Sequence, residues 1–493
     1  MNQRILNYLC ASVAIMSPFA MAAGNGIKVD HLGERNTMVR VSPDSTYLLL
    51  PVEDSADDSK IDILSDGNLK ESIMVRLAKE KVDFYVPLKL DGLKGSDVIL
   101  NIMTPHVSYT SSGADKCWSE FRLSNTFKVE NTEKYRPKFH HTPEWGWMND
   151  PNGMYYKDGV WTLCYQWNPY GSKWQNLSWG RSTSRDLVNW EHHPVALVPD
   201  GIGMIFSGSS AIDKTGSAGF GEGAVVSMYT SAAASQVQSL AHCDAAGNYV
   251  PYPGNPVLTM DSEARDPNMW FDEKEGLWHL SLAHALDHEM LFFTSPDLKE
   301  WTLTGSFGKV GAQDGVWECP DLFPLTFEGK EKWVLLCNLN PGGPFGGSAT
   351  QYFVGDFDGK TFKSDLDKDG NVPTKWLDFG KDHYATVSFS DAPDGRRTVI
   401  GWMSNWQYAN DVPTTQYRSA NTLPRDMKLF RGSDNELYVA SVPSPELSGM
   451  RGKAIVAGKS FAAGRKGKTF LLPKTNSGVC DVSYTHMKLP TTS

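Results

Sequence analysis

The chain has 493 residues, a formal net charge of −10 and a pI of about 5.7, with no long run of Lys or Arg. Hydrophobic residues make up 40% and charged residues 21%, which excludes a disordered, collagenous or coiled-coil chain, and the acidic balance argues against a nucleic-acid partner. The 44 Gly and 28 Pro residues favour many short strands over long helices, so we expect an all-β protein.

The first residues have the pattern of an export signal. Arg4 precedes an apolar stretch, and residues 20–22 (Ala-Met-Ala) offer small side chains at the positions that a signal peptidase reads. The alternative, an uncleaved membrane anchor, needs about 20 apolar residues, and Asn7 and Pro18 interrupt this stretch. We therefore expect residues 1–22 to be a cleaved signal peptide. The mature protein is then periplasmic, on the cell surface or extracellular, without a transmembrane span.

Residues 24–131 alternate apolar and polar positions between charged or glycine-containing turns. The runs 47–52 (YLLLPV) and 83–88 (DFYVPL) are examples. This pattern predicts strands with one buried face. The segment has no cluster of catalytic residue types, so we expect a small N-terminal β accessory domain. A charged linker at 131–138 follows it.

Residues 138–430 contain a repeat of apolar strand candidates. The markers of these strands are Trp161, Val226, Trp278, Trp333 and Val399. Their spacing, about 50–65 residues with several strands in each unit, is typical of a β-propeller, in which one unit is one blade. We therefore expect a five-bladed β-propeller over 138–430.

A short internal echo supports the repeat. The run SRDLVNW at 184–190 recurs as SPDLKEW at 295–301, which is two repeats later. The alternative, a β-sandwich with accidental spacing, does not explain this echo. Residues 431–493 contain only short strand-like runs and are too few for a full sandwich.

Three acidic residues precede three of the marked strands at similar distances. The pairs of acid and marker are Asp150 with Trp161, Asp266 with Trp278, and Glu318 with Trp333. Equivalent positions in a propeller are related by rotation about its central axis, so side chains at the start of each innermost strand converge on the mouth of the channel. We expect the three acids to share one pocket.

Carboxylates gathered in such a pocket cannot all ionise easily, so at least one pKa should rise while hydrogen-bonded neighbours keep another low. Glycoside hydrolysis needs this division, because one carboxylate attacks or stabilises the sugar centre and a protonated one gives its proton to the departing oxygen. Aromatic faces suited to a sugar are frequent nearby, although each tryptophan alone fits a structural role as well. They are Trp145, Trp147, Trp167, Trp174, Trp179, Trp317 and Trp402.

Five motifs, in chain order, carry a family resemblance. They are GWMNDPNG (146–153), YQWNP (165–169), FSGS (206–209), RDP (265–267) and ECPD (318–321). Over about residues 139–430 the chain resembles glycoside hydrolase family 32, the invertases, inulinases and levanases that act on β-fructofuranosides. The resemblance implies a five-bladed propeller and a retaining mechanism. We expect no metal or other cofactor.

The resemblance also implies roles for single residues. Asp150 would be the nucleophile, Glu318 the acid/base and Asp266 the stabiliser that holds two fructose hydroxyls. The residues that would line the fructose subsite are Asn149, Gln166, Trp174, Phe206, Ser207, Arg265 and Trp402. The family continues into a complete β-sandwich, so residues 431–493 are expected to be a short, incomplete C-terminal sandwich segment.

Other readings of the sequence stay open or are disfavoured. Exo-acting release of fructose is expected, with an endo-fructanase, a fructosyltransferase and a non-catalytic carbohydrate-binding propeller as alternatives. Residues 365–370 have the acidic spacing of a calcium loop, but Trp376 stands where such a loop has Glu. His279, His284 and His288 fit no zinc pattern, so no metal site is expected.

Overall fold

The computed structural model describes residues 26–452 except 43, 94–96, 130–131 and 261–262. This part of the chain is built from β-strands, and its helices are five 3₁₀ turns of three to six residues. None of these described helices has the length and apolar character needed to cross a membrane. The all-β prediction is confirmed. The expected signal peptide at 1–22 and the chain from residue 453 onwards lie outside the described residues.

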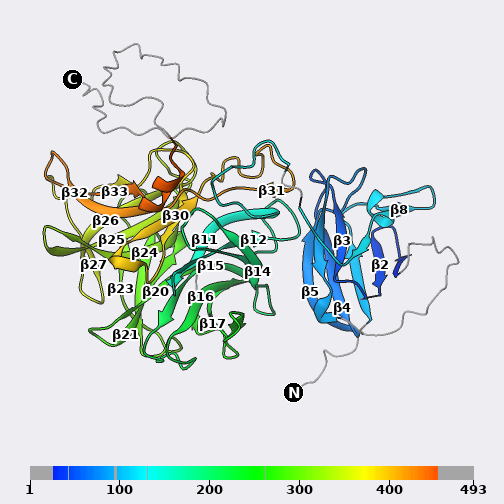
Figure 1. Ribbon diagram of the computed structural model, residues 1–493, viewed down its shortest axis with the longest axis horizontal. Helices are drawn as coiled ribbons and strands as arrows, with labels where there is room; N and C mark the ends of the chain where they lie inside the picture. Colours follow the sequence, from blue (N-terminus) through cyan, green and yellow to red (C-terminus); the bar gives the residue numbers. More distant parts are fainter. Residues whose placement is uncertain (1–25, 43, 94–96, 130–131, 261–262, 453–493) are drawn as a thin grey trace, which may run out of the picture.

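Residues 26–129 form two antiparallel sheets that pack face to face, here called the N-terminal sandwich (Figure 1). The strand orders are β1-β2-β7-β4-β5 and β10-β3-β6. Buried and more exposed residues alternate along β4, as expected for a sheet with one face on the core. Leu48 and Val86 from one sheet and Ile61 and Leu100 from the other belong to one buried cluster. The strands are β1 Ile27–His31, β2 Asn36–Val41, β3 Tyr47–Val52, β4 Ser59–Ser65, β5 Asn68–Val75, β6 Phe84–Lys89, β7 Val98–Met103 and β10 Arg122–Ser124, with a small hairpin of β8 Tyr109–Thr110 and β9 Gly113–Ala114.

Five sheets follow in chain order, each with four main antiparallel strands, and the first, second and fourth also have a short fifth strand. The first has β11 Gly146–Lys157, β12 Val160–Asn168, β13 Ser178–Ser184 and β14 Glu191–Leu197. The second has β15 Met204–Asp213, β16 Ala224–Ala232, β17 Gln236–Cys243 and β18 Tyr249–Pro251, and the short β19 Leu258–Thr259 also pairs with β17. The third has β20 Ala264–Asp272, β21 Leu277–His284, β22 Glu289–Ser295 and β23 Thr302–Gly308. The fourth has β24 Val316–Phe327, β25 Lys330–Asn340, β26 Ala349–Phe357 and β27 Phe362–Ser364, with β28 Lys375–Trp376 beside β26. The fifth has β29 Tyr384–Ser388, β30 Thr398–Trp402, β32 Arg425–Arg431 and β33 Leu437–Pro443.

The first strands of the five sheets contact one another in a closed ring. β11 contacts β15, β15 contacts β20, β20 contacts β24, β24 contacts β29, and β29 returns to β11. The short β31 (Tyr417–Arg418) also pairs in parallel with β11 and joins the end of the chain to the first sheet. Each sheet packs between two others, so strands such as β12 and β16 are buried almost continuously. This closed ring of five sheets is the five-bladed propeller expected from the repeat, and Figure 1 shows it beside the N-terminal sandwich.

The marker strands and the internal echo occupy equivalent places in the blades. All five markers lie on the second strand of a sheet, which are β12, β16, β21, β25 and β30. The echoed runs form the corner between the third and fourth strands of sheets one and three, where Asp186 and Asp297 each accept two backbone N–H groups. The next residue, Leu187 or Leu298, is buried with a φ of 57° or 66°. The echo therefore reflects one repeated turn.

The boundary expected after Phe430 does not coincide with the end of the fifth sheet. β33 pairs along its whole length with β32, from Arg431 opposite Leu437 to Arg425 opposite Pro443. The sequence predicts this strand as part of the C-terminal segment. In the structure a short hairpin connects it to β32, and it is the outer strand of the fifth blade.

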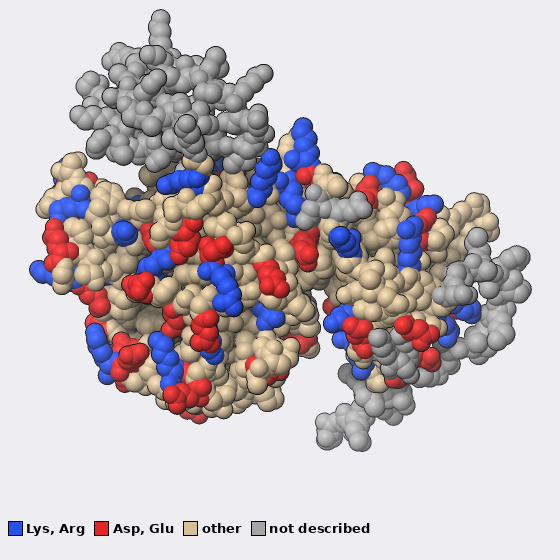
Figure 2. Space-filling model, viewed as in Figure 1, with Lys and Arg blue, Asp and Glu red and all other residues tan. Residues whose placement is uncertain are grey.

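The charged surface is mixed in sign. Figure 2 shows Lys and Arg interspersed with Asp and Glu over the visible face of both the propeller and the N-terminal sandwich. This face presents no basic stripe that could follow a phosphate backbone.

Candidate active site

The three acids of the sequence motifs lie on the first strands of three blades, at irregular points in the pairing. The ladder between β11 and β12 shifts register around Asp150, and that between β20 and β21 shifts around Asp266. Between β24 and β25 the shift begins immediately after Glu318. Asp266 and Cys319 have positive φ angles of 63° and 45°. Such bulges bend a strand and redirect its side chains, which is how three separate blades aim carboxylates at one place.

Asp150 is half-buried and held by three hydrogen bonds. Asn149 Nδ2 donates to its Oδ1 over 2.9 Å, and Ser207 Oγ donates to its Oδ2 over 2.8 Å. Cys319 Sγ lies 3.5 Å from the same Oδ2. Burial raises the pKa of Asp150 above its ordinary value, and the nearby charge of Glu318 adds to this, while the hydrogen bonds oppose it.

Asn149 is itself oriented by a neighbour. Trp147 Nε1 donates to Asn149 Oδ1 over 2.7 Å, so the amide presents its NH₂ group to Asp150. Trp147 is fully buried and stacks near Trp406, with ring centroids 5.7 Å apart. The buried indole therefore fixes which end of the amide meets the carboxylate.

Asp266 is the most enclosed of the three acids, with 6% of its surface exposed. Its Oδ2 accepts the backbone N–H of Cys319 over 3.0 Å and lies 3.4 Å from the Cys319 Sγ. Burial raises the pKa of Asp266 to about 7; Arg265 opposes this rise, and the charges of Glu318 and Asp150 add to it. We expected one carboxyl with a raised pKa and another with a low pKa. The two aspartates do not differ in this way, because burial raises the pKa of both.

Glu318 is held at both carboxylate oxygens. Arg265 donates from Nε and Nη2 to Oε1 over 3.1 and 3.0 Å, and Tyr384 OH donates to Oε2. Burial and the charge of Glu318 raise the pKa of Tyr384 well above its ordinary value, so the phenol keeps its proton as a donor. Arg265 also pairs with Glu263 at 3.1 Å. The Glu318 side chain is thus fixed in one orientation.

Cys319 lies between the carboxylates of Asp150 and Asp266. Its thiol reaches Asp150 and Asp266 from one position, and its neighbour in sequence is Glu318. Burial and the surrounding carboxylates raise the pKa of this thiol far above its ordinary value, so it stays protonated. Cys319 lies within the ECPD motif, but its sequence pattern predicts no role for it in the site.

Tyr384 is a second site residue that the sequence motifs did not identify, although its spacing within the repeat could have done so. It precedes the marker Val399 by the same interval as that between Glu318 and Trp333. In the structure Tyr384 is on the innermost strand β29, at another register shift. It is therefore the fifth blade's counterpart of Glu318.

The remaining expected residues lie around the acids in different ways. Gln166 is buried on β12, opposite the bulge that carries Asp150. Trp174 is 36% exposed and meets Phe206 edge to face, with ring centroids 6.1 Å apart. Trp402 is fully buried and packs against the indoles of Trp147 and Trp406.

Most tryptophans that could have faced a sugar belong to the core instead. Trp174 is the exposed one; Trp145 is half-buried, and the others are buried. The buried ones among those considered are Trp147, Trp167, Trp179, Trp317 and Trp402. Within the described residues no group of three or more His, Cys, Asp or Glu side chains has an arrangement suited to a metal ion.

Comparison with known proteins gives consistent matches. The model described as "Glycosyl hydrolases family 32 N-terminal domain" matches residues 140–441, and a domain of unknown function (DUF4980) matches residues 33–139. The levanase of Bacillus subtilis is 47% identical over 335 residues, which are 65% of this chain and 48% of that protein. The extracellular exo-inulinase of Aspergillus niger is 37% identical over 375 residues, covering 68% of this chain and 70% of that protein. The matched region thus spans about half of the levanase.

Solved structures agree in fold. The crystal structure of exo-inulinase from Aspergillus awamori superimposes with a TM-score of 0.60 at 37% identity, covering 64% of this chain and 68% of that one. The fructofuranosidase from Schwanniomyces occidentalis in complex with fructose gives the same TM-score at 37% identity, over 64% and 65% of the two chains.

Proposed function

Because the chain belongs to glycosyl hydrolase family 32, we propose that it hydrolyses the β-fructofuranosidic bonds of fructans such as levan or inulin, and of sucrose. The observation that carries this proposal is the meeting of Asp150, Asp266 and Glu318 around Cys319. The names of the levanase and exo-inulinase relatives support the substrate class.

The proposed reaction retains configuration in two steps. In the first, an oxygen of Asp150 bonds to the anomeric carbon of fructose, the glycosidic bond breaks, and its electron pair leaves with the departing oxygen, which takes a proton from Glu318. In the second, Glu318 removes a proton from water, the water oxygen bonds to the anomeric carbon, and Asp150 is released. Asn149 and Ser207 orient the attacking carboxylate, and their hydrogen bonds favour its ionised form.

Arg265 and Tyr384 orient Glu318 for its role in proton transfer. They hold both oxygens of Glu318, so that the same side chain can deliver a proton to the leaving group and later take one from water. We assign Asp266 to the fructose hydroxyls, because its buried carboxyl is the third acid of the cluster.

Two buried donors are available for a sugar. Gln166 Nε2 and Trp402 Nε1 have no hydrogen-bond partner among the described residues. Buried donors are normally paired, so a ligand hydroxyl would remove the cost of leaving them unpaired. Trp174 supplies an exposed aromatic face beside Phe206. These side chains, with Asn149, Ser207 and Arg265, form the proposed fructose subsite.

The proposal includes exo-acting cleavage and export. The acids lie at inner strands of the ring, where one terminal sugar fits more readily than the middle of a polymer. Export through residues 1–22 would place the enzyme where polymeric fructan is found. The N-terminal sandwich, the propeller and the segment after it are proposed as separate domains in this order.

The test is product analysis with the purified protein. Sucrose, inulin and levan are incubated with enzyme, and early products are separated. Free fructose should dominate while polymer length falls slowly. A ladder of oligosaccharides with little monomer would refute exo cleavage, and transfer of fructose to sugar instead of water would show a fructosyltransferase. With methanol as acceptor, a retaining enzyme yields the methyl β-fructofuranoside, whereas the α-anomer would refute the nucleophile role of Asp150.

A further inference from the structure

The loop that carries Trp174 is held by the N-terminal sandwich. This loop, residues 169–177, connects β12 to β13. Residues 171–177 are buried or half-buried except Trp174, which is exposed. One side of the loop therefore serves the candidate subsite, while the other makes contacts across to a different part of the chain.

The first contact closes the edge of a sheet. β5 is the edge strand of the five-stranded sheet, so its outward backbone groups have no strand partner. Asn176 supplies one: its Oδ1 accepts the N–H of Met74 and its Nδ2 donates to the carbonyl of Met74, both over 2.8 Å. Asn176 has a φ of 47°, a conformation that Asn tolerates better than most residues. The Asn176 side chain therefore makes, at this one residue, the backbone hydrogen bonds that a neighbouring strand would make.

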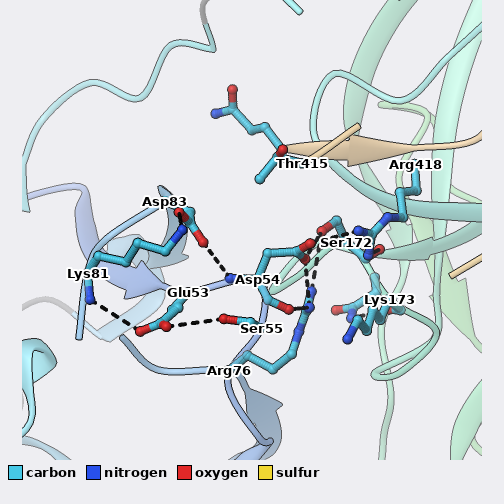
Figure 3. A network of polar contacts seen from close by, with 12 residues as sticks. Glu53, Asp54, Ser55, Arg76, Lys81, Asp83, Ser172, Lys173, Thr415 and Arg418 are labelled. Carbon is cyan, nitrogen blue, oxygen red and sulfur yellow. Dashed lines mark hydrogen bonds and ion pairs between the residues drawn. The ribbon is translucent and has the colours of Figure 1, made fainter. Parts of the chain in front are cut away.

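The second contact is a charged network centred on Asp54 (Figure 3). Asp54 follows β3 and pairs with Arg76 of the sandwich and Arg418 of the propeller, each over 2.7 Å. Ser172 of the loop donates to Asp54 over 3.2 Å and accepts from Arg76 over 3.3 Å. Arg418 also donates to the backbone carbonyl of Ser172 over 2.9 Å. Both guanidinium groups are almost fully buried, and the Asp54 carboxylate pairs with both of them.

The third contact is aromatic. Tyr170 packs against the core of the sandwich, and its hydroxyl donates to both oxygens of Glu71 over 3.3 Å. Trp145 packs against the same core and donates from Nε1 to the carbonyl of Pro169. The loop is therefore attached to the sandwich near its start, its middle and its end.

The sandwich has little of its own to bind sugar. Among described residues 26–129 no aromatic side chain is exposed, and the large exposed hydrophobic residues there are Leu32, Leu69, Met103 and Val107. Sugar-binding surfaces generally use exposed aromatic rings. This unit reaches the candidate site through its contacts with the 169–177 loop and through the pair of Asp54 with Arg418 on β31, which lies beside β11.

We propose that the N-terminal sandwich is a positioning element for substrate binding, in which Asp54 and Glu71 hold the 169–177 loop so that Trp174 faces the fructose subsite. This inference rests on the proposed function. Asp54 and Glu71 do not touch substrate; they act on affinity through Trp174. Loss of their contacts should raise KM and leave kcat nearly unchanged, because neither Asp54 nor Glu71 bonds to the three acids or to the donors that hold them.

Two variants and a matched control test the proposal with sucrose as substrate. Asp54→Asn keeps the shape but removes the charge shared by Arg76 and Arg418, and should raise KM about tenfold. Tyr170→Phe removes only the hydroxyl that bonds Glu71, and should raise KM about twofold to tenfold. Tyr85→Phe is the control, because it removes a similar hydrogen bond to Glu120 inside the sandwich. It should leave KM unchanged.

The decisive readout is a double-mutant cycle with Trp174→Ala. If the sandwich acts through Trp174, neither Asp54→Asn nor Tyr170→Phe changes KM further in the Trp174→Ala background. Equal effects in both backgrounds, an unchanged KM in the folded variants, or a loss confined to kcat would overturn the inference. If Asp54→Asn does not fold, Tyr170→Phe decides alone. A wild-type protein that releases no fructose from sucrose, inulin or levan would overturn the proposed function, and this inference with it.

Discussion

Asp266→Asn should inactivate the protein and stabilise it at neutral pH. Asp266 is buried, and its pKa lies at about 7 against an ordinary value of 3.8. A raised pKa in the folded state means that the folded protein binds the proton more tightly than the unfolded chain. The corresponding stability is fully present below about pH 4 and is lost as the pH rises to about 7.

The magnitude follows from the shift. Three pH units at about 1.4 kcal/mol each give a loss of about 4 kcal/mol between pH 4 and pH 7. Asparagine does not ionise, and its carbonyl oxygen can still accept the backbone N–H of Cys319 that Asp266 accepts now. The variant should therefore match the wild type near pH 4 and exceed it at pH 7.5 by up to about 4 kcal/mol.

Urea unfolding of both proteins between pH 4 and pH 8 measures this difference. Asp158→Asn is the control, because Asp158 is exposed in the turn after β11 at a φ of 51° that Asn accepts. It should follow the wild type at every pH. A stability difference for Asp266→Asn that is independent of pH, or that favours the wild type at pH 7.5, would refute the account of a carboxyl whose burial costs stability when it ionises.

Further predictions concern the other groups of the site. Asp150→Asn and Glu318→Gln should each lower kcat by about three or more orders of magnitude while leaving the fold intact, whereas Asp158→Asn and Glu328→Gln, in exposed turns at the far ends of the same strands, should retain activity. Near-normal turnover in either of the first pair removes that residue from its role. The raised pKa of Asp150 should displace the acidic limb of the kcat/KM profile above the range of an ordinary aspartate, since the nucleophile must be ionised; a rate that is flat down to pH 4 contradicts this. Tyr384→Phe should lower kcat about tenfold to a hundredfold by freeing Glu318 Oε2, and unchanged single-turnover rates would show that this hydrogen bond is dispensable.

The sequence was enough to predict the all-β class, the five repeats and the order of the three acids. Such features are encoded locally, because each blade must rebuild the same strands and turns from its own residues. Asp150, Asp266 and Glu318 could be placed together since equivalent positions in a repeat are related by rotation. The same argument extends to Tyr384, whose distance from Val399 matches that of Glu318 from its own marker.

Burial was much harder to predict. Seven tryptophans near the motifs had the same chemical character in the sequence, and Trp174 is the exposed one among them. Whether an indole faces solvent depends on how neighbouring blades stack, and the spacing of one chain segment does not contain that information. For the same reason the boundary at Phe430 missed β33, which becomes part of the fifth blade through its hairpin with β32.

The electrostatic character of the site and the attachment of the N-terminal sandwich are properties of the tertiary structure. The pKa of Asp266 follows from burial beside Arg265, Glu318 and Asp150, three groups contributed by three different inner strands. Asp54 meets Arg418 although 364 positions separate them in the chain. Composition and periodicity determine which strands form and which side of each is apolar. The partners of a charged group across blades, or between sandwich and propeller, are decided only when packing brings distant segments within hydrogen-bonding distance.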